Sequence, residues 1–213
     1  MPGLPHHVTQ PGNRRADIFE CDEDREVYLR LLGKYMKKYG VSLWAYCLMS
    51  NHVHLVLVPA AAESLSRCLR DTHTVYATHF NKRTQLSGHV WQGRFFSCAL
   101  DEAHLWAAVR YVERNPVRAG IVEKAEEFSW SSAAGHCGLK EDKLLAGEFP
   151  PVGVVDDWPT WLADEDPAYI EAVRKHTHTG RPCGSRTFLE GLEELLGKRL
   201  RPRKAGRKPK EGG

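Results

Sequence analysis

Two histidines separated by one residue stand at the start of an apolar run, Asn51-His52-Val53-His54-Leu55-Val56-Leu57. In a β-strand alternate side chains point to the same face, so the imidazoles of His52 and His54 would share one face. The opposite face would then hold Val53, Leu55 and Leu57. Two imidazoles on one face of a rigid strand are well placed to chelate one cation. The spacing therefore indicates a candidate metal site.

A tyrosine and an asparagine four residues apart, Tyr111 and Asn115, form a second candidate pair. In a helix they stack on one side, about 40° apart around the axis. Next to them runs an apolar stripe that would dock the helix: Leu105, Ala108, Val109 and Val112. The amide oxygen of Asn115 is a hard ligand that suits Mg²⁺ and Mn²⁺ equally. We therefore predict that His52, His54 and Asn115 hold a metal beside the phenol of Tyr111.

This combination suits phosphodiester chemistry. An unperturbed tyrosine hydroxyl has a pKa near ~10 and is a poor nucleophile at neutral pH. A divalent cation on the scissile phosphate neutralises developing charge and polarises the phosphoryl oxygen. Attack by Tyr111 would give a 5′-phosphotyrosine, and a free 3′-hydroxyl could later rejoin the DNA without a nucleotide cofactor. The sequence shows no Gly-rich phosphate loop of the P-loop type, which agrees with this.

The surrounding periodicity predicts an α+β fold. Period-two and buried runs indicate strands, while i, i+3, i+4 spacing indicates helices. The expected strands are His6–Gln10, Val41–Leu48, His52–Val58 and Arg94–Leu100, and the expected helices span residues 22–39, 63–81 and 101–115. Their order is that of a ferredoxin-like antiparallel sheet (split βαβ) with helices on one face and an added helix that carries the tyrosine. The first and third strands would be central.

We expect three segments along the chain. Residues 1–137 would form the catalytic domain. Residues 138–180 contain much Pro, Gly, Asp and Trp and are predicted to be an irregular linker, in which His176-Thr177-His178 lies in a solvated loop. Residues 181–213 would form a short amphipathic helix followed by a basic DNA-binding tail, whose composition cannot bury a core.

The charge distribution points to a polyanionic partner. The net charge is +3, but residues 198–213 hold 8 Lys and Arg against 1 acidic residue, a charge of +7. Residues 138–197 hold 6 against 12, a charge of −6. The basic tail, rather than the average, therefore indicates nucleic acid.

The motifs together resemble the REP-associated tyrosine transposases of the HUH superfamily of single-strand DNA transposases (IS200-like). The similarity covers about residues 5–135 and is carried by ordered stretches: His7-Val8-Thr9 with Gly12-Asn13-Arg14-Arg15, Cys47 to His54, Gly88 to Phe95, Tyr111 to Gly120, and Trp130-Ser131-Ser132. The resemblance implies a ferredoxin-like domain, one nucleophilic tyrosine, a divalent cation and hairpin-forming single-stranded DNA as substrate. Tyr111 matches the family nucleophile, His52 and His54 the histidine pair, and Asn115 the third polar ligand.

Ten cations are candidate DNA contacts: Arg14, Arg15, Arg94, Arg118, Arg199, Arg201, Arg203, Lys204, Arg207 and Lys208. Arg94 stands near two aromatic residues, Trp91 and Phe95, and the three fit a patch that binds phosphate and stacks unpaired bases. They fit equally well a strand with a solvent-reaching arginine.

Two other functions fit parts of the pattern. A domesticated protein that binds DNA hairpins without cutting needs the same basic surfaces but not the geometry of His52, His54 and Tyr111. A metal hydrolase for small substrates needs a further carboxylate or histidine ligand, for which the sequence offers no convincing candidate.

The pattern fits a monomer and a homodimer equally, since the tyrosine helix could serve either subunit. No apolar run approaches the ~20 residues of a membrane span, and the first 15 residues lack the order of a secretory signal. We expect a cytoplasmic protein with no membrane partner.

Overall fold

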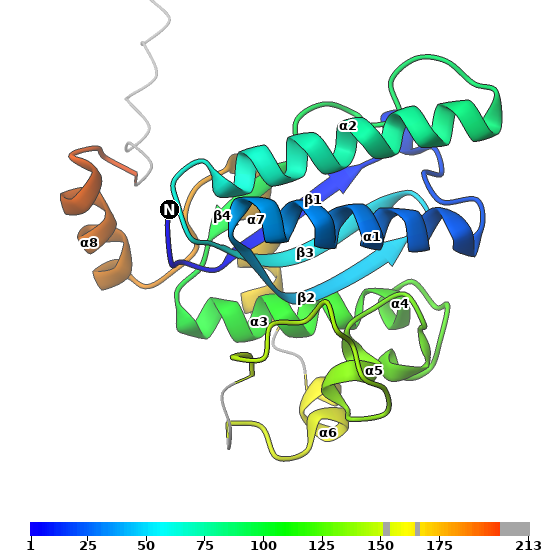
Figure 1. The fold of residues 1–213 in the computed structure, drawn as a ribbon. Coiled ribbons are helices and arrows are strands. Elements are labelled where there is room, and N and C mark those ends of the chain that lie inside the picture. Colours follow the sequence, from blue (N-terminus) through cyan, green and yellow to red (C-terminus); the bar gives the residue numbers. More distant parts are fainter. Residues whose placement is uncertain (151–153, 165–166, 201–213) are drawn as a thin grey trace, which may run out of the picture.

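A four-stranded antiparallel sheet with the strand order β2-β3-β1-β4 lies at the centre of the protein (Figure 1). The computed structural model describes residues 1–213 apart from 151–153, 165–166 and 201–213. The strands are β1 (His6–Pro11), β2 (Val41–Met49), β3 (His52–Pro59) and β4 (Phe96–Ala99). As expected for a ferredoxin-like sheet, the first and third strands are central, which confirms the predicted fold class.

Helices connect and cover the strands. Between the strands lie the 3₁₀ turn η1 (Asn13–Arg15) and the helices α1 (Asp22–Tyr39) and α2 (Ser64–Thr84). After β4 follow α3 (Glu102–Glu113), α4 (Asn115–Arg118), the 3₁₀ turn η2 (Ala125–Glu127), α5 (Ala133–His136), α6 (Trp158–Ala163), α7 (Pro167–Thr179) and α8 (Arg186–Leu196).

One face of the sheet packs against α1 and α2, which lie side by side in Figure 1. The core on this face contains the β3 side chains that the sequence assigned to it, Val53, Leu55 and Leu57. They pack with Leu32 of α1 and Leu69 of α2. All three are 0% exposed. Burying this set fixes the register of β3, because a slip by one residue would turn the histidines into the core.

The other face of the sheet packs against α3 and α7. The predicted stripe of α3, including Val109 and Val112, is buried there beside Val56 of β3 and Val173 of α7. Both faces are therefore covered. The sequence predicted the docked helix that carries Tyr111, but it did not predict α7. The side chains of His52 and His54 lie on this second face, under α3.

The helix that carries the tyrosine begins and ends where the sequence indicates. Asp101 caps it, since its side chain accepts a hydrogen bond of 3.0 Å from the backbone N–H of His104. The helix ends at Glu113, with Arg114 as its C-cap, and Pro116 occupies the first turn of the short α4 that follows. At α1, which spans the expected residues 22–39, the N-cap is Cys21, and Gly40, with φ of 64°, follows the last helical residue.

The prediction of an irregular linker over residues 138–180 is wrong in part. Two helices, α6 and α7, lie within it, and α7 packs on β4 and α3. His176-Thr177-His178 forms the last turn of α7 rather than a solvated loop, with Thr177 1% exposed. The boundaries of the three expected domains stay a prediction. The fourth strand is also shorter than expected, because it begins at Phe96.

A buried carboxylate at the end of α3 accepts hydrogen bonds from residues of α5 and α6 and from Ser132 before α5. Glu113 is 0% exposed. Its Oε1 accepts hydrogen bonds from Ser132 Oγ at 2.5 Å and from His136 Nδ1 at 2.6 Å, and its Oε2 accepts one from Trp158 Nε1 at 2.8 Å. Glu113 therefore holds α5 and α6 against α3, next to the candidate site.

Replacing Glu113 with alanine is expected to lower the free energy of unfolding by about 3 kcal/mol or more, because buried donors lose their acceptor. Urea denaturation at neutral pH measures this. The matched control is Glu102→Ala, which removes an exposed acid from the same helix. A change of Glu113→Ala no larger than that of the control would show that the cluster does not stabilise the fold.

Candidate active site

The two imidazoles of β3 stand next to each other on the face that α3 covers. The ring centroids of His52 and His54 are 4.9 Å apart, with planes at 88°. His54 is 5% exposed, while His52 is half-buried at the strand entrance. The predicted sharing of one face is therefore observed.

The ring of His52 is oriented by the preceding residue. The Nδ1 of His52 lies 2.6 Å from Asn51 Oδ1, and the amide nitrogen of Asn51 donates to the carbonyl of Arg15 at 3.4 Å. Because the amide nitrogen faces Arg15, its oxygen faces the imidazole, and Nδ1–H of His52 must be the donor. This leaves a lone pair on Nε2 of His52, the form in which histidine binds metals.

Burial keeps these imidazoles neutral. Desolvation lowers the pKa of His52 to about 4 and that of neighbouring His7 in β1 to about 3. Desolvation, followed by the charges of His7 and His52, holds the pKa of His54 well below its usual range. At neutral pH all three rings are therefore uncharged and able to act as ligands or hydrogen-bond acceptors.

The phenol of Tyr111 lies against the imidazoles. Its ring centroid is 5.2 Å from that of His54 and 5.6 Å from that of His7, in edge-on contacts. The apolar stripe of α3 docks on the sheet and leaves Tyr111 at the margin, 7% exposed. One chain thus brings the tyrosine and the histidine pair together.

Two arginines flank the tyrosine ring. The guanidinium of Arg118 lies 4.3 Å from the ring centroid and also donates to the Tyr111 carbonyl. The guanidinium of Arg174 lies 5.1 Å from the same centroid, and its Nε donates to Tyr111 Oη at 3.3 Å. Positive charge over the ring and at the hydroxyl favours an anionic group there, such as a phosphate or a phenolate.

Asn115 is not joined to the histidine pair. It is half-buried at the first position of α4, one turn after Tyr111. Within the described part of the chain, no hydrogen bond links its amide to either imidazole. The described residues also contain no group of three or more His, Cys, Asp or Glu that could hold a metal ion. A site at His52 and His54 would therefore need Asn115 or substrate oxygens to complete it.

The predicted DNA-contacting cations fall into separate places. Arg14 and Arg15 are exposed in η1, and both have φ above +50°. Arg199 is exposed after α8. The remaining tail residues lie outside the described residues: Arg201, Arg203, Lys204, Arg207 and Lys208.

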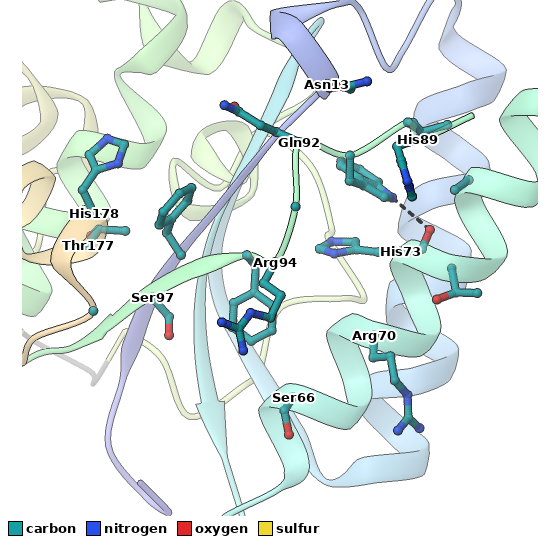
Figure 2. A pocket seen from close by; sticks show the side chains of 18 of the residues that line it. Asn13, Ser66, Arg70, His73, His89, Gln92, Arg94, Ser97, Thr177 and His178 are labelled. Carbon is teal, nitrogen blue, oxygen red and sulfur yellow. Dashed lines mark hydrogen bonds between the residues drawn. The ribbon is translucent and has the colours of Figure 1, made fainter. Parts of the chain in front are cut away.

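Arg94 lines a groove with a volume of about 1560 Å³ (Figure 2). Arg70 enters it from α2. Its aromatic lining includes Trp91 and Phe95, and Trp91 Nε1 donates to the His73 carbonyl at 2.9 Å. The groove therefore combines cations and aromatic rings along one surface. It ends at the last turn of α7, where Thr177 and His178 lie.

Three residues at this site were missed or left without a role by the sequence reasoning. Arg174 and Thr177 lie on α7, in the segment predicted to be a linker, and His7 had no assigned function. Spacing of the buried residues Ile170, Val173 and Thr177 at i, i+3 and i+7 was the signal that could have indicated a docked helix.

Similarity to known proteins decides the family. A family model described as "Transposase IS200 like" matches residues 3–115, more than half of the 213-residue chain. The chain belongs to the IS200-like transposase family. The membership of the IS200-like family that the sequence motifs indicated is thereby confirmed. No curated protein matches this transposase.

Solved structures show which fold this transposase shares. The structure of a REP-associated tyrosine transposase bound to a REP hairpin is 20% identical, with a TM-score of 0.54, over 70% of this chain and 88% of that one. A crystal structure of a candidate transposase from Deinococcus radiodurans R1 is 17% identical, with a TM-score of 0.40, over 52% of this chain and 89% of that one. The first supports the α+β fold described above.

Every helix within the described residues of the transposase is too short or too polar to cross a membrane.

Proposed function

We propose that this transposase cleaves and rejoins single-stranded, hairpin-associated DNA through a 5′-phosphotyrosine at Tyr111, with Mg²⁺ or Mn²⁺ bound by His52, His54 and Asn115. One observation carries the proposal: the phenol of Tyr111 lies edge-on to His54, 5.2 Å between centroids, in a chain of the IS200-like family. Because one chain holds both groups, the proposed reaction takes place within one subunit, in a monomer or in each subunit of a homodimer.

The residues present fit a divalent cation. His52 is neutral and keeps a lone pair on Nε2, and Asn115 supplies a harder amide oxygen close in sequence to Tyr111. These three ligands leave coordination positions for water and for oxygens of the DNA phosphate. When bound, the cation supplies neutralisation of the charge that develops on the scissile phosphate.

The protein's own groups then carry the transfer. Tyr111 Oη forms a bond to phosphorus and loses its proton to solvent, while the bond from phosphorus to the 3′-oxygen breaks and that oxygen takes up a proton. Arg118, over the Tyr111 ring, and Arg174, at Tyr111 Oη, stabilise the negative charge of the phosphate during this step. A later attack by a 3′-hydroxyl reverses the step and releases Tyr111, so the phosphodiester energy is conserved.

We propose that the DNA partner is a hairpin with an unpaired flank. The similar structure of the REP-associated transposase was solved with a REP hairpin. In this chain the groove lined by Arg94, Arg70 and Trp91 offers cations for phosphates and a ring for bases, which suits a single strand. The exposed pair Arg14 and Arg15 is available for the duplex backbone.

Replacing Arg94 with alanine is expected to weaken binding of a hairpin with a single-stranded flank by about three- to tenfold at low salt. The salt dependence should also become shallower, because one phosphate contact is lost. Fluorescence anisotropy over a salt series measures both. Arg30→Ala, which removes an exposed arginine of α1 outside the groove, is the control. Equal losses in the two variants would argue against the groove as the strand's path.

The central experiment is incubation with a library of labelled DNA hairpins in Mg²⁺, Mn²⁺ or a chelator, followed by denaturing gels. A protein-linked strand that appears only with metal is the expected result. Tight hairpin binding with no linked strand under any metal would instead favour a domesticated hairpin-binding protein.

A further inference from the structure

A second imidazole that is not a proposed ligand meets His54 from β1. His7 Nε2 lies 3.0 Å from His54 Nδ1, and the two ring planes differ by 12°. On its other side, His7 Nδ1 lies 2.7 Å from Thr177 Oγ1. Thr177 Oγ1 in turn lies 2.7 Å from the carbonyl oxygen of Val173, one turn earlier in α7. His7 and Thr177 are each 1% exposed.

The direction of the hydrogen bond between His7 and Thr177 follows from the bond between Thr177 and Val173. Two oxygens 2.7 Å apart need a proton between them, and only the hydroxyl of Thr177 has one, so it donates to Val173. The oxygen of Thr177 must then accept from His7 Nδ1–H. Its remaining lone pair faces Cys98 Sγ at 3.2 Å, where the thiol can donate. Every group around Thr177 is satisfied in this arrangement.

The direction of the hydrogen bond between His7 and His54 follows in turn. His7 is enclosed, and within the described structure its ring nitrogens bond only to Thr177 and His54, neither of which is a carboxylate, so the ring stays neutral. Its one proton is on Nδ1, so His7 Nε2 is an acceptor. His54 Nδ1 must therefore carry a proton and donate it to His7. This places the lone pair of His54 on Nε2.

We propose that His7 and Thr177 are positioning residues that hold His54 in the tautomer and ring plane needed to bind the metal through Nε2. The inference rests on the proposed role of His54 as a ligand. It assigns part of the metal site to α7, beyond the residues 3–115 that match the family model. The ring of His52 is oriented by its neighbour Asn51. The ring of His54 is instead oriented by His7, which bonds to Thr177 across 170 residues of sequence.

The tautomer is measured directly in the metal-free protein. Long-range ¹H–¹⁵N spectra of ¹⁵N-histidine-labelled protein distinguish a protonated ring nitrogen from one with a lone pair, and a His54→Gln variant assigns the signal. The expected result is a protonated Nδ1 and an unprotonated Nε2 at His54. Protonation at Nε2 in the unmodified chain would overturn the inference without touching the proposed reaction.

Matched variants test the relay, which is the chain of hydrogen bonds from His54 through His7 to Thr177. Thr177→Val keeps the shape but removes the acceptor for His7, while Thr177→Ser keeps the hydroxyl. We expect Thr177→Val to shift His54 toward the Nε2-protonated form and to weaken Mn²⁺ binding, measured by calorimetry, by about 10- to 100-fold. Thr177→Ser should behave like the unmodified chain in both measurements. Unchanged spectra and unchanged Mn²⁺ affinity in Thr177→Val would refute the relay.

The two proposals fail in different ways. If the unmodified transposase shows the expected tautomer but binds no Mn²⁺, with or without a DNA hairpin, the metal role of His52 and His54 fails, and the positioning role with it. If Mn²⁺ binds and DNA is cut while His54 is protonated at Nε2, only the positioning inference fails. A DNA-cleavage assay of Thr177→Val alone cannot distinguish failure of the metal role from failure of the positioning role. The spectra are needed for that distinction.

Discussion

Replacing Tyr111 with phenylalanine is expected to abolish the covalent protein–DNA adduct, with a loss of more than about 10³-fold in the rate of strand cleavage. The variant keeps the aromatic ring and its edge-on contacts with His54 and His7, and it removes only the hydroxyl that Arg174 holds. Hairpin binding should stay within about twofold, because the ring still supports both arginines. Denaturing gels with labelled hairpins measure the adduct, and anisotropy measures binding.

The matched control for this change is Tyr169→Phe. Tyr169 is 38% exposed on α7 and contacts the ring of His104, away from the imidazole pair. Its variant should form adducts at the normal rate. If Tyr111→Phe still formed a protein-linked strand, another residue would be the nucleophile, and the proposed reaction at Tyr111 would have to be abandoned.

Replacing His52 with alanine is expected to remove cleavage at low metal concentration, because a site with few protein ligands that loses one of them binds its ion much more weakly. His52 suits this test better than His54, since it is half-buried and its removal leaves the contact between His54 and His7 in place. Cleavage is followed over a range of Mg²⁺ and Mn²⁺ concentrations. Partial recovery at high metal concentration agrees with a lost ligand.

A histidine elsewhere controls for the change of residue type. His79 of α2 is half-buried against Tyr76, and neither residue lines the groove or touches the site. His79→Ala should cut normally. Full cleavage by His52→Ala at low Mg²⁺ would remove His52 from the proposed ligand set, and the ion would then have to bind elsewhere.

Much of the site geometry is local, and so the sequence determined it. The two-residue period of a strand places His52 and His54 on one face, while Val53, Leu55 and Leu57 fix that choice by being buried on the other. The apolar spacing of α3 docks the helix that carries Tyr111, and Asp101 marks where that helix begins, whereas Asn115 follows in α4 after a break at Arg114. The strand order follows from the alternation of elements, which has few compact solutions.

Only the tertiary structure decided what surrounds these residues. Arg174 meets Tyr111 across 63 residues of sequence, and Thr177 meets His7 across 170. Arg174 and Thr177 lie in residues 138–180, whose Pro, Gly and acidic residues indicate no strong preference for helix or strand. The local sequence pattern of this segment therefore resembles that of a linker. The helix α7 is stabilised there by burying Ile170 and Val173 against α3 and the sheet. Such a gain exists only after the sheet has formed, because most helical stability comes from tertiary packing rather than from local propensity.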